Sequence, residues 1–258
     1  MKLLFVCLFL SVNATAGITP EALELWKKRD NKESLQAAVK LLEATPRDLE
    51  TLTYLTRGYF LLGDVYTSED DEKLKVFEKA KKSGEEGMSL NEDFKKLKEK
   101  DITKAIDTLT LKEIDVLYWS AAALGKWAKA NGIMSSLKYK GQILAMIKKV
   151  EMLKADYFYG AVDRYMGGFY ALAPGIAGGD MDKAKERFQR AMKNAPENLG
   201  TKVWYAEVYL TKEDEEKEFV KVLNEVLAAP NGPEEIAPEN IMEKRKAADL
   251  LKRKEKLF

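Results

Sequence analysis

A recurring helical pattern limits what this chain can fold into. Four residues of one stretch, Ala184, Phe188, Ala191 and Pro196, stand at offsets 0, 4, 7 and 12. The first three fall on one face of a helix, where small residues let a second helix approach closely, and the proline ends the helix. Another proline, Pro230, follows Pro196 by 34 residues, which is one period of a helix-pair repeat. The pattern predicts stacked helices.

Further segments carry the same pattern, with apolar residues at helical spacing around a turn residue. They are Val203, Ala206, Tyr209, Leu223 and Val226 in the C-terminal copy, Leu52, Leu55, Tyr59, Phe77 and Ala80 after Pro46 and Asp48 in the N-terminal copy, and Ile143, Ile147 and Val150 in a fainter middle copy. The middle copy has Ala155 where the proline would stand. This spacing resembles the tetratricopeptide repeat (TPR), and no segment alternates with the period of a strand. We expect an all-α, TPR-like α-solenoid of antiparallel helix pairs, with about ten to twelve helices.

The rest of the chain fits one helical body over residues 17–258. Leu117 to Trp127 is rich in alanine with aromatic residues at its ends, which favours a helix packed on several sides. Ala229 to Asn240 contains three prolines and a glycine and is interpreted as a linker. A basic helix over residues 241–258 would then cap the last apolar face of the solenoid.

The first sixteen residues have the features of a secretory signal. Lys2 precedes the apolar run Leu3 to Leu10, and Ala14-Thr15-Ala16 is a small-x-small cleavage site. The mature chain is expected to begin at Gly17. No later segment has the roughly 20 apolar residues that a membrane-spanning helix needs. Cys7 follows Phe5-Val6 and lacks the context of a lipid-anchored cysteine, so a soluble periplasmic protein is predicted.

Charge and composition exclude several classes of function. Without Lys2 the 43 basic residues of the chain become 42, which equals the 42 acidic residues. A neutral chain has no electrostatic footprint for nucleic acid. The chain has no histidine and Cys7 is its one cysteine, so residues 17–258 contain neither thiol nor imidazole. We therefore expect no cofactor, no metal and no catalytic residues.

Two helical stretches supply candidates for a ligand site. In the first, Lys126 lies between Trp119 and Trp127, where an ammonium group could contact a carboxylate or lie over an indole ring. A lysine extended into solvent beside core aromatic residues explains the pattern as well. Both interpretations stay open on sequence alone.

The second stretch is apolar on nearly every side and contains a charged pair. Phe158, Val162, Tyr165 and Phe169 fall on one helical face, and Tyr159, Met166 and Tyr170 fall on another. Such a helix is usually buried. Asp163 and Arg164 therefore need partners, and ion pairs with neighbouring helices are the simpler explanation. The alternative is that Arg164, with Tyr165 and Phe169, holds the anionic head of an amphipathic ligand.

The glycine-rich segment Pro174 to Asp180 precedes another helix. Backbone amides at such a position can bind phosphate. Asp180 would occupy those amides with its own carboxylate, and no Gly-Lys-Ser/Thr follows. We interpret the segment as a turn between two helices.

The run from Tyr118-Trp119 to Gly125-Lys126-Trp127, the segment Gly167 to Asp180 and the tail from Glu239 to Phe258 together resemble the T-component family of tripartite ATP-independent periplasmic (TRAP) transporters. The resemblance implies an α-helical periplasmic protein that pairs with the transporter's solute-binding protein, and it leaves self-association open. It implies no catalytic residues. Some members of that family resemble lipoproteins, which this chain does not.

The sequence leaves three alternative functions open. The first is a module that holds a partner protein or an apolar or amphipathic ligand on a concave helical surface. The second is a glycosidase or lytic enzyme of the envelope that uses only carboxylates, which would place a glutamate of raised pKa in a deep aromatic cleft. The third is a purely structural scaffold of the envelope.

Overall fold

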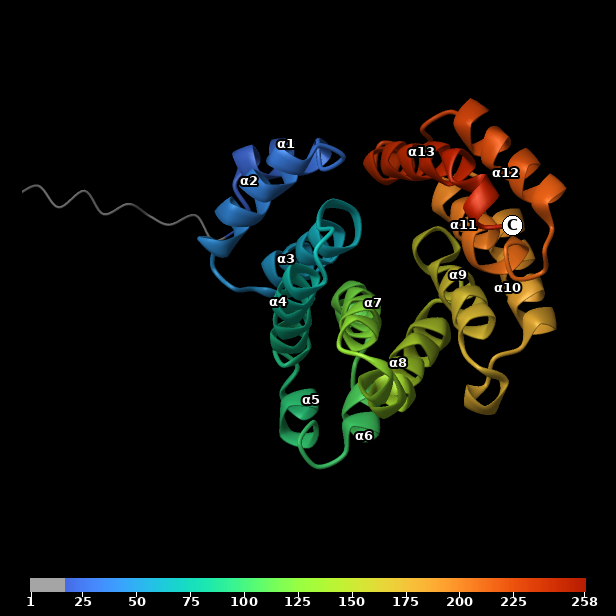
Figure 1. Cartoon of the computed structure of the whole chain (residues 1–258). Coiled ribbons are helices and arrows are strands. Elements are labelled where there is room, and N and C mark those ends of the chain that lie inside the picture. Colours follow the sequence, from blue (N-terminus) through green and yellow to red (C-terminus); the bar gives the residue numbers. More distant parts are fainter. Residues whose placement is uncertain (1–16) are drawn as a thin grey trace, which may run out of the picture.

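The computed structural model describes residues 17–258, and this part of the chain is helical throughout, with no strand. Thirteen α-helices follow one another around a curved body (Figure 1). The predicted all-α class is confirmed, and the helix number is one above the predicted range. Two of the helices, α5 and α6, are short and lie in the segment between α4 and α7.

The apolar residues of the predicted repeat copies all lie within helices or their π-helical turns. The helices are α1 Pro20–Lys27, α2 Lys32–Glu43, α3 Leu49–Leu61, α4 Asp70–Met88, α5 Glu92–Leu97, α6 Ile102–Asp107, α7 Ile114–Ala130, α8 Ile133–Leu153, α9 Tyr157–Leu172, α10 Met181–Asn194, α11 Leu199–Tyr205, α12 Glu216–Ala228 and α13 Ala237–Lys252. Helices α3 and α11 each continue into a π-helical turn, Leu62–Tyr66 and Ala206–Leu210. These two turns therefore stand at the same place in the first and last repeat copies.

Short polar side chains fix where several helices begin. The carboxylate of Asp48 accepts a hydrogen bond from the backbone amide of Thr51 (2.8 Å), and Asp180 accepts one from Lys183 (3.0 Å). Each bond satisfies an amide that the first turn of a helix leaves without a partner. Asp180 thus ends the glycine-rich loop by starting α10, and the interpretation of that loop as a helix-to-helix turn is confirmed.

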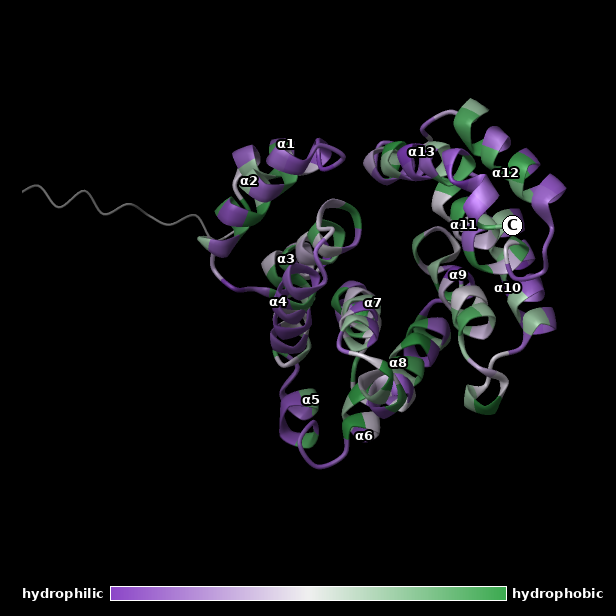
Figure 2. Ribbon diagram, viewed as in Figure 1, coloured by the Kyte–Doolittle hydropathy of each residue, from purple (hydrophilic) through white to green (hydrophobic). Residues whose placement is uncertain are grey.

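Neighbouring helices in the sequence pack on one another, and the short α5–α6 pair is bypassed by a direct contact of α4 with α7. The residues that defined the three repeat copies are buried at these contacts. Figure 2 shows the resulting separation of hydrophobic and hydrophilic faces on single helices, most clearly along α12. The sequence pattern therefore located the inward faces correctly.

The last helix differs from its prediction in position and in role. It was expected at residues 241–258, but α13 spans Ala237–Lys252 and a 3-10 turn follows at Lys254–Lys256. Pro238 lies in its first turn, where a proline is tolerated because its missing amide would have no helical partner. The segment interpreted as a linker thus contains the start of this helix.

Helix α13 joins the two ends of the body. Its Ala247 and Leu250 belong to the C-terminal core, formed by α9 to α13. Its Met242 instead belongs to the N-terminal core, beside Leu55 and Tyr59 of α3. Figure 1 shows the N-terminal end of α13 directed toward α1. The expected role, a cap on the last apolar face, is therefore only half of what α13 does.

Helix α9 begins with a backbone that the sequence did not predict. Phe158, Tyr159 and Gly160 have φ angles of 41°, 54° and 71°. This left-handed conformation is costly for bulky residues, on the order of 1–2 kcal/mol each. It removes Phe158 and Tyr159 from the helical faces assigned to them. Gly160 fits because its backbone meets that of Ala191, and a Cβ there would be 3.4 Å from Ala191 Cα.

Within residues 17–258, no helix has both the length and the apolar character to cross a membrane. The predicted secretory signal at residues 1–16, its cleavage after Ala16 and the role of Cys7 lie outside the residues that the structure describes.

Two buried threonines of α3 give a matched test of the packing. The hydroxyl of Thr56 donates to the carbonyl of Leu52 (2.7 Å), but the hydroxyl of Thr51 has no partner among the described residues. Valine has the shape of threonine without the hydroxyl. We expect Thr51→Val to raise the free energy of unfolding by about 1 kcal/mol and Thr56→Val to lower it by about 1 kcal/mol, because only the second loses a hydrogen bond. Urea unfolding would contradict this account if both changes had the same sign.

Candidate functional site

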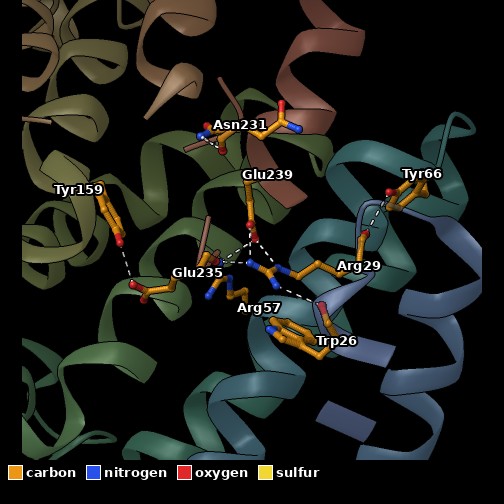
Figure 3. Close-up of polar contacts among 9 residues, drawn as sticks. Trp26, Arg29, Arg57, Tyr66, Tyr159, Asn231, Glu235 and Glu239 are labelled. Carbon is orange, nitrogen blue, oxygen red and sulfur yellow. Dashed lines mark hydrogen bonds and ion pairs between the residues drawn. The ribbon is translucent and has the colours of Figure 1, made fainter. Parts of the chain in front are cut away.

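A cluster of buried charges, which we call the arginine–glutamate seam, joins the N-terminal helices to α13 (Figure 3). It consists of Arg29 after α1, Arg57 in α3 and Glu239 in α13. Arg29 donates to both oxygens of the Glu239 carboxylate (2.8 and 2.6 Å), and Arg57 donates to Oε1 (2.6 Å). The seam links residues 210 positions apart in the sequence. It fixes the two ends of the body to each other.

Backbone groups complete the coordination of Arg29. Its guanidinium also donates to the carbonyls of Trp26 (3.1 Å) and Glu235, and Tyr66 donates to the carbonyl of Arg29 (3.1 Å). Nearby, the hydroxyl of Tyr159 donates to the Glu235 carboxylate (2.9 Å). These acceptors hold the buried guanidinium in place.

Arg57 is also surrounded by aromatic rings. Its guanidinium carbon lies 4.8 Å from the ring centroids of both Trp119 and Phe158, and 5.6 Å from that of Trp26. These distances allow cation–π attraction. The unusual backbone of Phe158 thus places a ring against the seam. Nε of Arg57 is buried without a partner among the described residues.

The seam sets the ionisation of Glu239. Burial alone would raise the pKa of this carboxyl, but the charges and hydrogen bonds of Arg57 and Arg29 outweigh burial, and the pKa lies below its usual value. Glu239 is therefore ionised at neutral pH.

A second group of charges, the inner charged cluster, lies where α7, α9, α13 and the two π-helical turns approach one another. It comprises Asp64 and Glu207 in the π-helical turns, Lys126 in α7, Arg164 in α9, and Glu243 and Lys246 in α13. Lys126 pairs with Asp64, and Lys246 pairs with Glu207 (2.5 Å). Burial raises the pKa of Glu243, and the nearby carboxylates Asp64 and Glu207 raise it further. The positive charges of Lys246 and Arg164 lower it, but the pKa remains above its usual value. π-Helical turns are frequent at functional sites, and here both contribute a carboxylate.

The structure places the six residues proposed as ligand-binding in several different surroundings, and Lys126 and Arg164 both belong to the inner charged cluster. Trp119 is buried beside Arg57, and Lys126 is bound to Asp64. Arg164 donates to the carbonyl of Tyr159 (3.0 Å) and lies 3.5 Å from the Thr201 hydroxyl. Tyr165 has a pKa raised by burial, and its hydroxyl lies against Gly125. Phe169 packs on Tyr170, with 5.5 Å between the ring centroids, at the far end of α9.

Trp127, the remaining candidate, lines an open groove of about 390 Å³ between α4 and α7. The groove is lined by Leu74, Lys75, Glu78, Lys79, Lys82 and Trp127. Lys81, which lies between Lys79 and Lys82 in α4, sits over the Trp127 indole, 3.9 Å from the ring centroid. The groove therefore combines an apolar floor with three lysines. A second groove, of about 340 Å³, lies where the glycine-rich loop meets Lys212 and Glu213.

Asp163 has the neighbouring partners that its burial required. Arg187 (2.8 Å) and Arg190 (2.7 Å) of α10 both donate to its carboxylate, and Arg187 also donates to Glu151 (2.7 Å). The simpler explanation of this aspartate, ion pairing between helices, is confirmed.

Sequence reasoning missed the seam. Arg57 stands alone among Leu55, Tyr59 and Phe60 in an apolar helix. The argument that singled out Asp163 and Arg164, a charge on an otherwise apolar stretch, applies to Arg57 equally well. Glu239 offered no comparable signal, because it lies in a charged and proline-rich segment.

Among the described residues, Glu243 has the raised pKa expected of a glycosidase acid, but it lines neither groove. Among residues 17–258 no three acidic side chains lie close enough to hold a metal ion.

Packed helices closed by a terminal helix, with two open grooves on their surface, define an all-α protein. The sequence matches the TRAP transporter T-component family over residues 40–258, most of the chain. The chain belongs to this family, as its residues had indicated, and the family is one of transporter components rather than of enzymes. A comparison with curated proteins found no match.

Proposed function

We propose that this protein acts in the periplasm as the T component that binds the solute-binding protein of a TRAP transporter. The observation that carries the proposal is the family match, which extends from residue 40 to the end of the sequence. The secretory features of residues 1–16 support a periplasmic location with cleavage near Ala16. A helical body closed by α13 supports a rigid platform for a partner.

Direct association tests this proposal. The protein would be mixed with the solute-binding protein encoded beside TRAP membrane subunits in the same genome, and sedimentation velocity would follow the complex. We expect a faster-sedimenting species that is absent when a solute-binding protein of an unrelated transporter is used. Sedimentation of the two proteins as separate species at micromolar concentrations would refute the partnership.

The groove beside Trp127 favours a second activity, the binding of an amphipathic anion. Its volume of about 390 Å³ falls within the usual range for a small-molecule site. Leu74 and Trp127 offer an apolar surface, and Lys75, Lys79 and Lys82 offer positive charge at its edge. Glu78 pairs with Lys81 (2.8 Å) and more loosely with Lys82 (3.8 Å). Lys79 lies 3.8 Å from Glu43, so Lys75 is the groove lysine without an ion pair among the described residues. A fatty acid or a related amphiphilic carboxylate matches this distribution of chemistry.

Tryptophan emission can follow such binding, because Trp127 lines the groove. We expect fatty acids to give a saturable change that Trp127→Phe removes. Lys75→Ala should weaken binding about three- to tenfold, since it removes one exposed charge contact. Arg164→Ala is the matched comparison, because Arg164 was the anion-binding candidate from sequence. Loss of affinity in Arg164→Ala with unchanged affinity in Lys75→Ala would move the site from the groove to the inner charged cluster.

A further inference from the structure

The hairpin formed by α7 and α8 carries a surface that neither the partner nor the ligand proposal uses. Where α8 begins, Ile133, Met134 and Leu137 expose 67%, 75% and 51% of their surface. All three lie on one side of α8 within its first one and a half turns, because residues three and four apart are neighbours on a helix. Such adjacent exposed apolar residues usually mark an interaction surface.

A loop from another part of the chain extends this surface. Lys140 in α8 donates to the carbonyl of Ala177 (3.3 Å), which holds the loop between α9 and α10 beside α8. The neighbouring residue of that loop, Ile176, is fully exposed. We name the four residues Ile133, Met134, Leu137 and Ile176 the apolar tip.

The α7–α8 part of the apolar tip carries charge of one sign, whereas the loop of Ile176 continues to Asp180 and Asp182. Residues 116–150 contain six lysines and no aspartate or glutamate. Lys126 is paired with Asp64, and Lys149 donates to the carbonyl of Asp107 (2.7 Å). Within residues 17–258, Lys129, Lys138 and Lys140 form no ion pair, although Lys129 is near enough to Asp64 to contribute to the lowering of its pKa. Helix α8 also carries Tyr139, whose ring packs on Trp127 with 5.5 Å between the centroids.

We propose that the apolar tip and the lysines beside it dock the protein onto an anionic lipid surface. Exposed aliphatic residues that enter the boundary of the acyl chains, flanked by lysines and aromatic rings, are the composition of a segment that lies on a membrane. A basic surface near anionic lipid gains on the order of 1 kcal/mol for each lysine. No described helix crosses a bilayer, so the attachment is peripheral.

Charge decides against a two-fold contact of the apolar tip with its own copy. A two-fold contact would bring the same patch of each molecule together, and with it two sets of lysines. Like charges that face each other across an interface are unfavourable. An anionic surface instead complements them.

Vesicle co-sedimentation tests the proposal. The full chain would be expressed with its own N-terminal segment, purified as the cell processes it, and mixed with vesicles containing phosphatidylglycerol or with vesicles of phosphatidylcholine alone. We expect binding to the anionic vesicles only, and a large loss of binding when salt rises from about 0.05 M to about 0.5 M, because salt screens the lysines.

Two variants separate the contributions of the tip. Ile133→Ser with Met134→Ser and Leu137→Ser should lower the partition coefficient at least tenfold, whereas Met152→Ser, an equally exposed methionine at the other end of α8, should leave it unchanged. Lys129→Gln with Lys138→Gln should lower it about thirtyfold, and Lys185→Gln on α10 should not. All of these side chains are exposed, so circular dichroism should show folded variants.

Equal binding to both kinds of vesicle would overturn the proposal, and so would wild-type binding by the triple variant. A third contradicting result is that the wild type forms an oligomer, the triple variant does not, and neither binds vesicles. The last result would assign the apolar tip to self-association. Binding of a protein partner that the triple variant loses, without vesicle binding, would assign it to that partner.

Discussion

Glu239→Gln should lower the free energy of unfolding by about 3 kcal/mol, because it leaves the charges of two buried arginines without their counter-ion. The side chains of Arg29 and Arg57 are only 3% and 12% exposed, so water cannot replace the carboxylate. Glutamine keeps the shape of the side chain and removes only the charge. Urea unfolding followed by circular dichroism measures the effect.

Glu86→Gln is the matched control for this change. Glu86 accepts two hydrogen bonds from Arg47 at 2.6 Å, the geometry of the seam, but both side chains are more than 40% exposed. An exposed pair of this kind contributes at most about 1 kcal/mol. Similar losses in the two variants would show that burial of the seam contributes nothing.

The pH dependence of the stability difference between the wild type and Glu239→Gln tests the contribution of the Glu239 carboxylate in a second way. The pKa of Glu239 is lowered on folding, so its contribution is complete above the unfolded value, near 4.5, and is lost as the pH falls through the lower pKa of the folded state. The difference in stability between the wild type and Glu239→Gln should therefore be constant above about pH 5.5, roughly one unit above the unfolded pKa, and should shrink in more acidic solution. A difference that grows on acidification would contradict the assignment.

Phe188→Ala should cost about 3–5 kcal/mol, because it removes a wholly buried ring from the centre of the C-terminal core. The ring lies against Gly167 so closely that a Cβ there would be 2.9 Å from it. It also packs edge to face on Tyr205, with 5.6 Å between the centroids. Helices α9 and α10 cannot close the space without moving their backbones, so a cavity remains.

Phe169→Ala is the comparison for Phe188→Ala, since Phe169 lies on the face of α9 that is only partly buried. We expect less than half the loss of stability at Phe169. Equal losses at the two positions, measured as shifts of the urea midpoint at constant slope, would mean that Phe188 does not organise the core.

Local pattern was sufficient to predict the helices and their inward faces. Ala184, Phe188 and Ala191 are all buried, because the period of 3.6 residues follows directly from helical geometry. The turn prolines located the helix ends in the same way, and α10 ends at Asn194, two residues before Pro196. Both bounds of α13 were misjudged, and at its start Pro238 marks a first turn rather than a linker.

Contacts between distant segments could not be predicted. The bond of Arg29 to Glu239 depends on how far the whole body curves, which is the sum of small rotations at each helix contact. The left-handed backbone at Phe158 and Tyr159 was equally hidden, since bulky residues favour other conformations and tertiary contacts impose this one. The sequence could therefore single out candidate residues such as Trp127 and Arg164, but it could not show which of them lie together in the fold.

Closure by α13 changes how the protein should come apart. In an open array of repeats each unit holds only its neighbours, so terminal units fray and exchange their amide hydrogens first. Here α13 places Met242 in the core of the first helices and Leu250 in the core of the last. Neither end can then loosen without breaking contacts of the other, so amides at the two extremes of the chain would be released together, in one cooperative event.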